Sequence, residues 1–145
     1  MINGNLTKKY LTSTFNNLSE MKILNLTSKG IKSIDIDAFK DLTLLLTLYL
    51  DDNKIVNIDS LVFRDLISLK DLDLSNNKIK KINVCAFKNV INLSNLRLAK
   101  NKIENIGTNF LIELVLLEDK NIHFSIIERK IINGILSMDD TLYLL

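Results

Sequence analysis

The chain has no proline, no tryptophan and only four glycines among its 145 residues. Proline and glycine are the residues that most often mark loops and interdomain linkers, and no stretch of this chain is rich in them. The sequence therefore predicts a single domain, residues 1–145. A chain of this length is long enough to bury a real hydrophobic core.

Cysteine is nearly absent as well. The single cysteine, Cys85, cannot form an internal disulfide, and we interpret it as a free, unreactive thiol. No apolar run reaches the length of about 18 residues that a transmembrane helix needs, so we expect no membrane insertion by this segment. The first ten residues, MINGNLTKKY, lack the apolar core of a signal peptide.

Neither sign of charge predominates. The chain has 19 basic and 17 acidic residues, for a net charge of +2. The lysines are spread along the sequence, which gives no electrostatic argument for a nucleic-acid partner. The apolar fraction of 47% is too high for a disordered chain.

The residues that carry enzyme chemistry are scarce. His123 is the only histidine, so a histidine-rich metal site is excluded, and no glycine-rich phosphate loop is present. The acidic pairs Asp51–Asp52 and Asp139–Asp140 lack the spacing of a metal-binding loop. The sequence predicts a protein that is not an enzyme, with no catalytic, cofactor-binding or metal-binding residues.

What the chain does contain is a repeat. Residues 69–92 read LKDLDLSNNKIKKINVCAFKNVIN, and the pattern L-x-x-L-x-L-x-x-N-x-I-x-x-I-x-x-x-x-F-x-x-V recurs at a period of 24 residues. Such a period indicates a stack of structural units that bury one another's apolar faces. The predicted units are a partial repeat 1–20, repeats 21–44, 45–68, 69–92 and 93–112, a degenerate repeat 113–138, and the start of another repeat at 139–145.

The two ends of the array fit the pattern less well. Phe15 lies 24 residues before Phe39, and the same register places Ile2 and Asn5 where Leu50 and Asn53 lie two repeats later. We therefore expect the chain to begin part-way through a repeat, near the second half of its strand. Near the other end, residues 126–136 also have the spacing of an amphipathic helix, so residues 113–138 are either a repeat or a capping helix.

Each regular repeat opens with a Leu-x-Leu segment, such as Leu48-Tyr49-Leu50. Alternation at period two predicts a short strand with both leucines pointing inward, and stacked repeats would pair these strands in parallel. Asn53, Asn77 and Asn101 follow the strands, and their side-chain amides suit the turning backbone of neighbouring repeats. Lys29 replaces asparagine in the first regular repeat, where we expect a looser turn.

The second half of each repeat carries further apolar columns. Phe39, Phe63 and Phe87 form a predicted spine behind the strands. Asp35, Asp59, Asn83 and Gly107 recur just before the spine, and these residue types favour the start of a helical turn.

These repeats resemble the typical 24-residue class of the leucine-rich repeat family, as in Toll-like receptors, Slit and small leucine-rich proteoglycans. The resemblance implies an α/β fold, a right-handed solenoid with short parallel strands on its concave face and short helical turns or irregular segments on its convex face. It also implies ligand binding on the concave face.

The resemblance has a bearing on location. Extracellular members carry cysteine-rich caps, a signal peptide and often an anchor, none of which this sequence shows. An extracellular or cell-surface location is expected if the chain is part of a longer one, and a cytoplasmic location if it is complete. Sequons for N-glycosylation, which favour a secretory history, occur at Asn5, Asn17, Asn25 and Asn92.

The outward positions of the predicted strands are the candidate binding surface. Tyr49 and Arg97 belong to residue types that are enriched at binding hot spots, and Asp73 lies between them in the predicted column. We estimate the surface at about 400 Å², roughly half of what one partner buries in a standard interface. The candidate residues are Asn25, Thr47, Tyr49, Asp51, Asp71, Asp73, Asn95 and Arg97.

Two functions are consistent with the sequence. The first is a non-catalytic protein–protein interaction module, a segment of a receptor or adhesion-type protein with a role such as innate immune signalling. The alternative is a truncated or degenerate structural repeat fragment without a dedicated partner. We also expect the isolated chain to self-associate through uncapped ends, because bare apolar edges favour aggregation.

Overall fold

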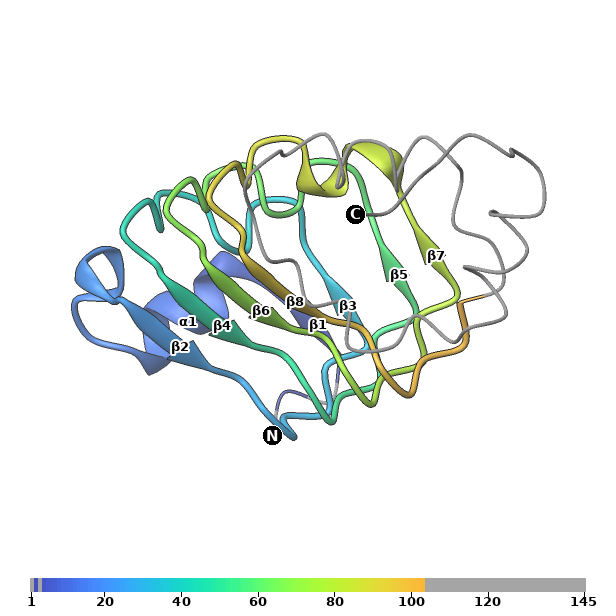
Figure 1. Cartoon of the computed structure of the whole chain (residues 1–145). Helices are drawn as coiled ribbons and strands as arrows, with labels where there is room; N and C mark the ends of the chain where they lie inside the picture. Colours follow the sequence, from blue (N-terminus) through green and yellow to red (C-terminus); the bar gives the residue numbers. More distant parts are fainter. Residues whose placement is uncertain (1, 3, 104–145) are drawn as a thin grey trace, which may run out of the picture.

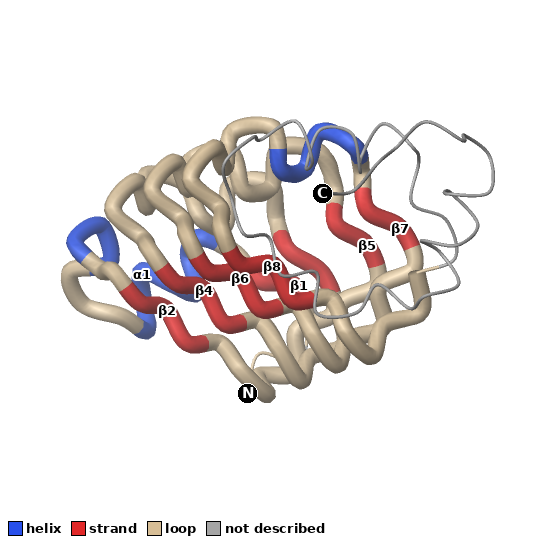
Figure 2. Tube along the Cα trace, in the orientation of Figure 1, coloured by secondary structure: helices blue, strands red, loops and turns tan. Residues whose placement is uncertain are grey.

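The computed structural model describes Ile2 and residues 4–103, and these residues wind into successive coils (Figure 1). Each coil contributes one short strand to a main sheet, and most of the remaining backbone is loop (Figure 2). The strands of the main sheet, in spatial order, are β2 (Ile23–Asn25), β4 (Thr47–Tyr49), β6 (Asp71–Asp73) and β8 (Asn95–Arg97). The predicted units at 113–138 and 139–145, and the end of the repeat at 93–112, lie outside the described residues.

All pairs in the main sheet are parallel and follow the 24-residue period, as predicted. Leu48 pairs with Leu24 on one side and with Leu72 on the other, and Leu72 pairs with Leu96. The first three of these leucines are fully buried, and Leu96 is 2% exposed. A three-residue strand has too few hydrogen bonds to persist alone, so each strand depends on the leucines that its neighbours bury with it.

Two smaller sheets lie behind the main sheet. The first joins β1 (Asn5–Leu6) to β3 (Ser33–Ile34), and the second joins β5 (Asn57–Ile58) to β7 (Lys81–Ile82). Both pairs are parallel, and the second keeps the 24-residue period. Strands β3, β5 and β7 end at Ile34, Ile58 and Ile82, which occupy the second isoleucine position of the repeat pattern.

The first coil breaks the period, and the predicted register of the N-terminal residues is wrong. Asn5 pairs with Ser33, 28 positions later, so it does not take the place of Asn53. The cause is α1 (Lys8–Thr14), in which Leu11 is fully buried. The Thr7 hydroxyl caps this helix by accepting from the backbone N–H of Tyr10 at 3.2 Å. A helix has about 3.6 residues per turn, so one added turn accounts for the displacement of four positions.

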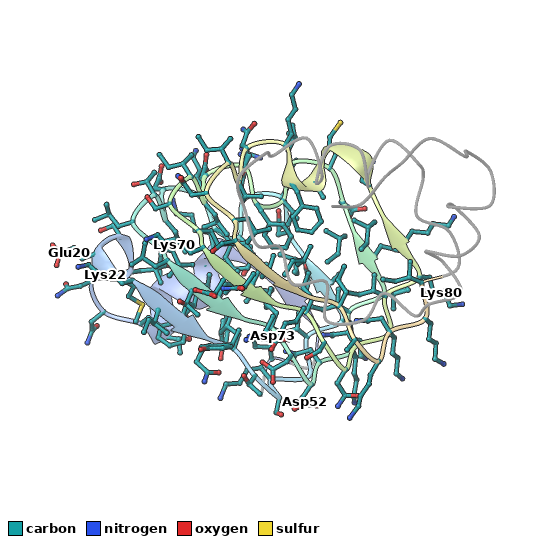
Figure 3. All side chains as sticks on the ribbon, in the orientation of Figure 1. Glu20, Lys22, Asp52, Lys70, Asp73 and Lys80 are labelled. Atoms are coloured by element: carbon teal, nitrogen blue, oxygen red, sulfur yellow. The ribbon has the colours of Figure 1, made fainter. Side chains whose placement is uncertain are left out.

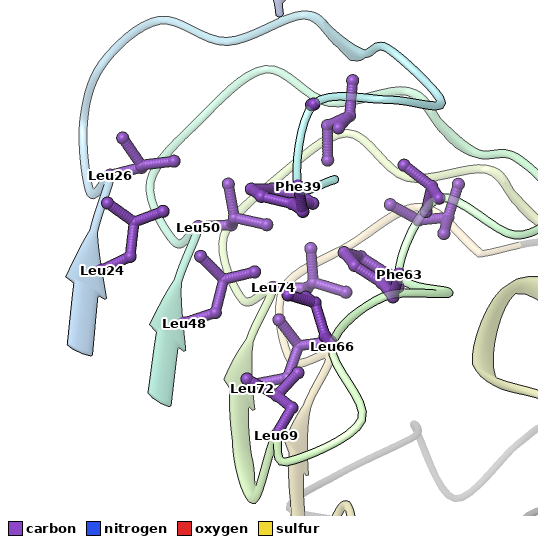
Figure 4. Close-up of a cluster of buried hydrophobic side chains, with 14 of the residues drawn as sticks. Leu24, Leu26, Phe39, Leu48, Leu50, Phe63, Leu66, Leu69, Leu72 and Leu74 are labelled. Atoms are coloured by element: carbon purple, nitrogen blue, oxygen red, sulfur yellow. The ribbon is translucent and has the colours of Figure 1, made fainter. Parts of the chain in front are cut away.

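The interior behind the main sheet is a stack of aromatic rings and leucines (Figure 4). The rings of Phe39 and Phe63 are 5.9 Å apart, and those of Phe63 and Phe87 are 5.5 Å apart, both pairs stacked. The predicted phenylalanine spine is therefore confirmed. Offset ring pairs at these distances add a stabilisation of about 1 kcal/mol to the burial of their area.

The predicted helical turns are short. One 3-10 turn, η2 (Val84–Phe87), follows Asn83, whose side chain accepts from the backbone N–H of Cys85 at 3.0 Å. The other, η1 (Leu18–Glu20), lies in the first coil. Asp35 accepts from the backbone N–H of Asp37 at 3.3 Å, but a turn rather than a helix follows it.

The asparagine column forms a continuous ladder between coils. The Asn77 amide nitrogen donates to the carbonyl oxygens of Leu50 and Leu74 at 3.0 and 3.1 Å, and its oxygen accepts from the N–H of Ile55 at 3.0 Å. Each asparagine thus pairs backbone groups of the preceding coil, which confirms its predicted role. Asn53 does the same for the coil that contains Lys29, accepting from the Lys29 N–H at 3.0 Å. The turn at Lys29 is therefore hydrogen-bonded to the next coil, although lysine replaces asparagine there.

Candidate protein-binding face

The side chains that point outward from the main sheet form one surface, which we call the sheet face. The central leucine of each strand is buried, and the residues on either side of it are half-buried or exposed. This follows from the geometry of a strand, in which successive side chains alternate between the two faces. The parallel register aligns the outward residues in two columns: Ile23, Thr47, Asp71 and Asn95, then Asn25, Tyr49, Asp73 and Arg97.

Seven of the eight predicted site residues lie in these two columns, and the eighth, Asp51, lies two residues after the end of β4. Adjacent strands in a sheet are about 4.8 Å apart, so neighbours in each column are within contact distance. The structure therefore brings the predicted residues together in space. Their role in binding stays a prediction.

Asp73 is held in place by its neighbours. One carboxylate oxygen accepts from the Ser75 N–H at 2.9 Å and from the Ser75 hydroxyl at 2.5 Å. The other oxygen faces the Arg97 guanidinium at 3.6 Å. Only 14% of the Asp73 side chain is exposed, against 49% for Arg97. Asp73 thus orients Arg97 across the β6–β8 pair and closes the turn after β6, and it presents little surface of its own.

Two further carboxylates are engaged across the strands. Asp71 accepts from the side-chain amide of Asn95, and Asp51 accepts from the Thr27 hydroxyl at 2.8 Å. Hydrogen bonds between directly opposed side chains stabilise a sheet pair by a few tenths of a kcal/mol, roughly 0.2–1. The aspartates Asp51, Asp71 and Asp73 are therefore pre-organised, because hydrogen bonds within the protein fix their side chains before any partner arrives.

Tyr49 differs from its acidic neighbours. It is half-buried between Asn25 and Asp73, and within residues 4–103 its hydroxyl has no hydrogen-bond partner. A tyrosine whose ring is partly covered and whose hydroxyl is free can add both apolar area and a hydrogen bond to an interface. Tyr49 and the exposed half of Arg97 are the parts of the sheet face best placed to contact another molecule.

The prediction from sequence omitted one exposed apolar side chain. Ile23 lies on β2 in the same column as Thr47 and is 60% exposed, the highest value among the large apolar residues that the structure describes. Its position in the column was the available signal. The candidate set contained only residues with polar groups, so Ile23 was not included in it.

The described residues offer no other chemistry at this face. Among Ile2 and residues 4–103, no three histidine, cysteine, aspartate or glutamate side chains lie close enough to hold a metal ion. No helix in this part of the chain is both long and apolar enough to cross a membrane. Nothing in the geometry of the sheet face points to catalysis.

Comparison with known proteins supports this description. The family model for the leucine rich repeat matches residues 1–55 and 43–103, which together exceed half of the chain. No curated protein sequence matches the chain.

Solved structures give further matches. The leucine-rich repeat domain of APL1 superposes with a TM-score of 0.68 at 24% identity, over 83% of this chain and 31% of that one. A chain of the LRIM1/APL1C complex gives 0.67 at 26% identity, over 75% and 20%. The complex of TLR13 with ssRNA13 gives 0.63 at 37% identity, over 77% and 15%.

The chain spans less than a third of the length of each of these proteins. The likeness is therefore to a stretch of coils within a longer array, and it agrees with the parallel strands and the 24-residue register seen here. Taken together, the matched family model, the shared fold and the asparagine ladder show that this chain belongs to the leucine-rich repeat family and folds as an α/β solenoid.

Proposed function

We propose that this chain is a non-catalytic protein-interaction module of receptor or adhesion type, and that its sheet face binds a protein ligand. Proteins of this fold are scaffolds on which binding surfaces are built, so the argument for this one comes from the surface itself. The observation that carries the proposal is the pre-organised row of Asn25, Tyr49, Asp73 and Arg97. Tyrosine and arginine, which this row contains at Tyr49 and Arg97, are residue types that are typical of binding hot spots.

Relatives support the receptor part of the proposal. LRIM1 and APL1C occur together in a complex, and TLR13 occurs in a complex with ssRNA13. A role in innate immune recognition at the cell surface or outside the cell is the corresponding proposal for this chain. The sheet face of four strands is smaller than a standard interface of about 800 Å² per partner, so we expect neighbouring coils or edges to contribute.

The test compares three versions of the 145-residue chain as bait. The first is unchanged, the second carries Tyr49→Ala, Asp73→Ala and Arg97→Ala, and the third is a control with Lys9→Ala, Lys32→Ala and Asp59→Ala at exposed sites away from the sheet face. A protein that the first and third versions retain and the second loses supports the proposal. Equal capture by all three would overturn the placement of the site.

A fourth version separates binding from folding. Asp73 closes the turn at Ser75, so its replacement can loosen that turn as well as remove a contact. The double variant Tyr49→Ala and Arg97→Ala leaves this turn intact. It should lose the same protein while its thermal melt, followed by circular dichroism, stays close to that of the unchanged chain.

The alternative of a repeat fragment without a partner predicts that no protein is captured by the unchanged chain and lost by the double variant. Self-association of the isolated 145-residue chain stays a prediction. Sedimentation velocity over a range of concentrations tests it, and a concentration-independent monomer would contradict it.

A further inference from the structure

Lysines that are scattered in the sequence come together on one edge of the solenoid. Five of them lie in the segments that follow β4, β6 and β8, the sixth, Lys81, is the first residue of β7, and all six are exposed. We call this group the lysine rim: Lys54, Lys78, Lys80, Lys81, Lys100 and Lys102. Lysines that are spread along the sequence are therefore neighbours at this edge of the fold.

Backbone hydrogen bonds hold these turns side by side. The N–H of Lys54 donates to the carbonyl of Ile31 at 2.7 Å, and the N–H of Lys78 donates to the carbonyl of Ile55 at 2.9 Å. The N–H of Lys102 donates to the carbonyl of Ile79 at 2.9 Å in the same way. Because one bond of this kind links each coil to the next, three lysines form a column with a spacing close to that of the strands, about 4.8 Å.

The charges of the lysine rim have no ion-pair partner among the described residues. Within the part of the chain that the structure describes, none of the six lysines forms an ion pair. No acidic residue occurs in residues 74–82 or 98–103, which hold five of the six. Like charges at this spacing repel one another, and solvent offsets only part of the repulsion. An anionic partner would relieve it.

The lysine rim is separate from the lysines at the other ends of the strands. Figure 3 shows Lys80 on the opposite side of the molecule from Lys22 and Lys70, which lie with Glu20 near β2. Lys22 and Lys70 precede β2 and β6, whereas the lysine rim follows the strands. The positive patch is therefore local, which agrees with the small net charge of the whole chain.

An apolar side chain lies within the lysine rim and narrows the choice of partner. Val56 is 37% exposed, and its carbonyl accepts from the N–H of Lys80 at 2.8 Å. A phosphate or sulfated-sugar backbone carries no aliphatic side chain to cover a valine, but a polypeptide does. No aromatic residue occurs in residues 51–58, 74–82 or 98–103. These segments therefore lack the aromatic side chains on which bases stack at single-stranded nucleic-acid sites.

We propose that the lysine rim binds an extended acidic polypeptide segment with at least one aliphatic side chain. The lysines contact the carboxylates, and Val56 contacts the aliphatic group. This surface is distinct from the sheet face, and its partner segment can belong to the same ligand or to another protein. The proposal does not depend on binding at Tyr49 and Arg97.

Fluorescence anisotropy of labelled probes with the full chain tests the proposal. The main probe is a 12-residue peptide of glutamates with one central leucine, and its control has glutamine in place of every glutamate. Two further probes of similar charge, an RNA dodecamer and a sulfated heparin oligosaccharide, distinguish the source of the negative charge. We expect the acidic peptide to bind best, with an affinity that falls as salt is added.

Two triple variants with the same change in net charge locate the site. Lys78→Gln, Lys80→Gln and Lys102→Gln should weaken acidic-peptide binding about tenfold, since each exposed ion pair contributes modestly. Lys9→Gln, Lys22→Gln and Lys70→Gln should change it less than about twofold. Val56→Ser should weaken binding about twofold and leave binding of an all-glutamate peptide unchanged.

The outcomes are decisive in both directions. Equal loss in the two triple variants would show a general charge effect and overturn the proposal. Tighter binding of RNA or heparin than of the peptide would overturn the assignment of a polypeptide partner. Retained peptide binding by the variant Tyr49→Ala and Arg97→Ala would confirm that the lysine rim acts independently of the sheet face.

Discussion

The first coil and the coils that follow it bury similar leucines but differ in how they turn behind the sheet. The later coils repeat every 24 residues, stack a phenylalanine on the next phenylalanine, and share an asparagine ladder. The first coil contains a helix, and its strand β1 pairs with β3 at a displacement of 28 residues. The next coil has Lys29 at the asparagine position, so this position has no asparagine side chain to bond to the backbone of the first coil. The comparison shows that this solenoid accepts an insertion of one helical turn behind the sheet without losing the register of the sheet itself.

The largest expected effect comes from a leucine between two coils. Leu72 is fully buried and pairs with Leu48 and Leu96 on either side. Leu72→Ala should lower the free energy of unfolding by about 4 kcal/mol, because it opens a cavity between coils. Leu11→Ala in the first coil should cost less, about 2–3 kcal/mol, since α1 can shift to fill the space. Urea denaturation followed by circular dichroism measures both, and a larger loss for Leu11→Ala would contradict the comparison.

The asparagine ladder gives the next largest effect. Asn77→Ala leaves the carbonyl of Leu50 and the N–H of Ile55 without their partner, and should cost about 2–4 kcal/mol. The same denaturation experiment measures it. The reverse change at Lys29, in the second coil, sharpens the comparison, because the first coil, which an asparagine at this position would reach, is displaced by four residues. Lys29→Asn should therefore change stability by less than about 0.5 kcal/mol, and a clear gain would show that the ladder extends into the first coil.

The cap of α1 gives a smaller effect that is confined to the first coil. Thr7→Ala removes the oxygen that accepts from the Tyr10 N–H, and should lower stability by about 1 kcal/mol. Thr7→Ser keeps a hydroxyl and should recover most of the loss. The thermal midpoint measures both changes. If Thr7→Ala had no effect, the Thr7 hydroxyl would not contribute to the stability of α1.

The smallest effect is a dependence on pH at the contact between the first coil and the second. The Lys8 ammonium donates a hydrogen bond to the Asp41 carboxylate and holds the pKa of that carboxyl below its ordinary value. A carboxyl with a lower pKa in the folded state adds stability above its unfolded pKa and loses it as the pH falls through the folded pKa. The pair is exposed, so Asp41→Asn should shift the melting temperature only slightly near neutral pH, and the shift should vanish once the pH falls below the folded-state pKa of Asp41. Lys8→Gln should give the same profile, and opposite shifts in the two variants would exclude the ion pair as the cause.

Much of the fold could be predicted from residue spacing. The positions of the strands, the pairing of Leu48 with Leu72, the phenylalanine spine and the asparagine ladder all follow from residue types that recur every 24 positions. The eight predicted residues of the sheet face were also found together, because alternation along a strand and a constant period fix which side chains are neighbours. Asn5 lies in a stretch of sequence that does not recur at the 24-residue period. Its register was therefore predicted wrongly.

The sequence by itself therefore determined the interior, since an apolar column must recur with the period of the coil to stay buried. Tertiary structure alone decided which polar and charged side chains of the surface pair with one another. It made Asp73 a partner of Ser75 and Arg97, and it gathered lysines up to 48 positions apart, from Lys54 to Lys102, on one edge. The physical reason is that burial constrains every coil in the same way, whereas an exposed charge is constrained only by the neighbours that stacking places beside it.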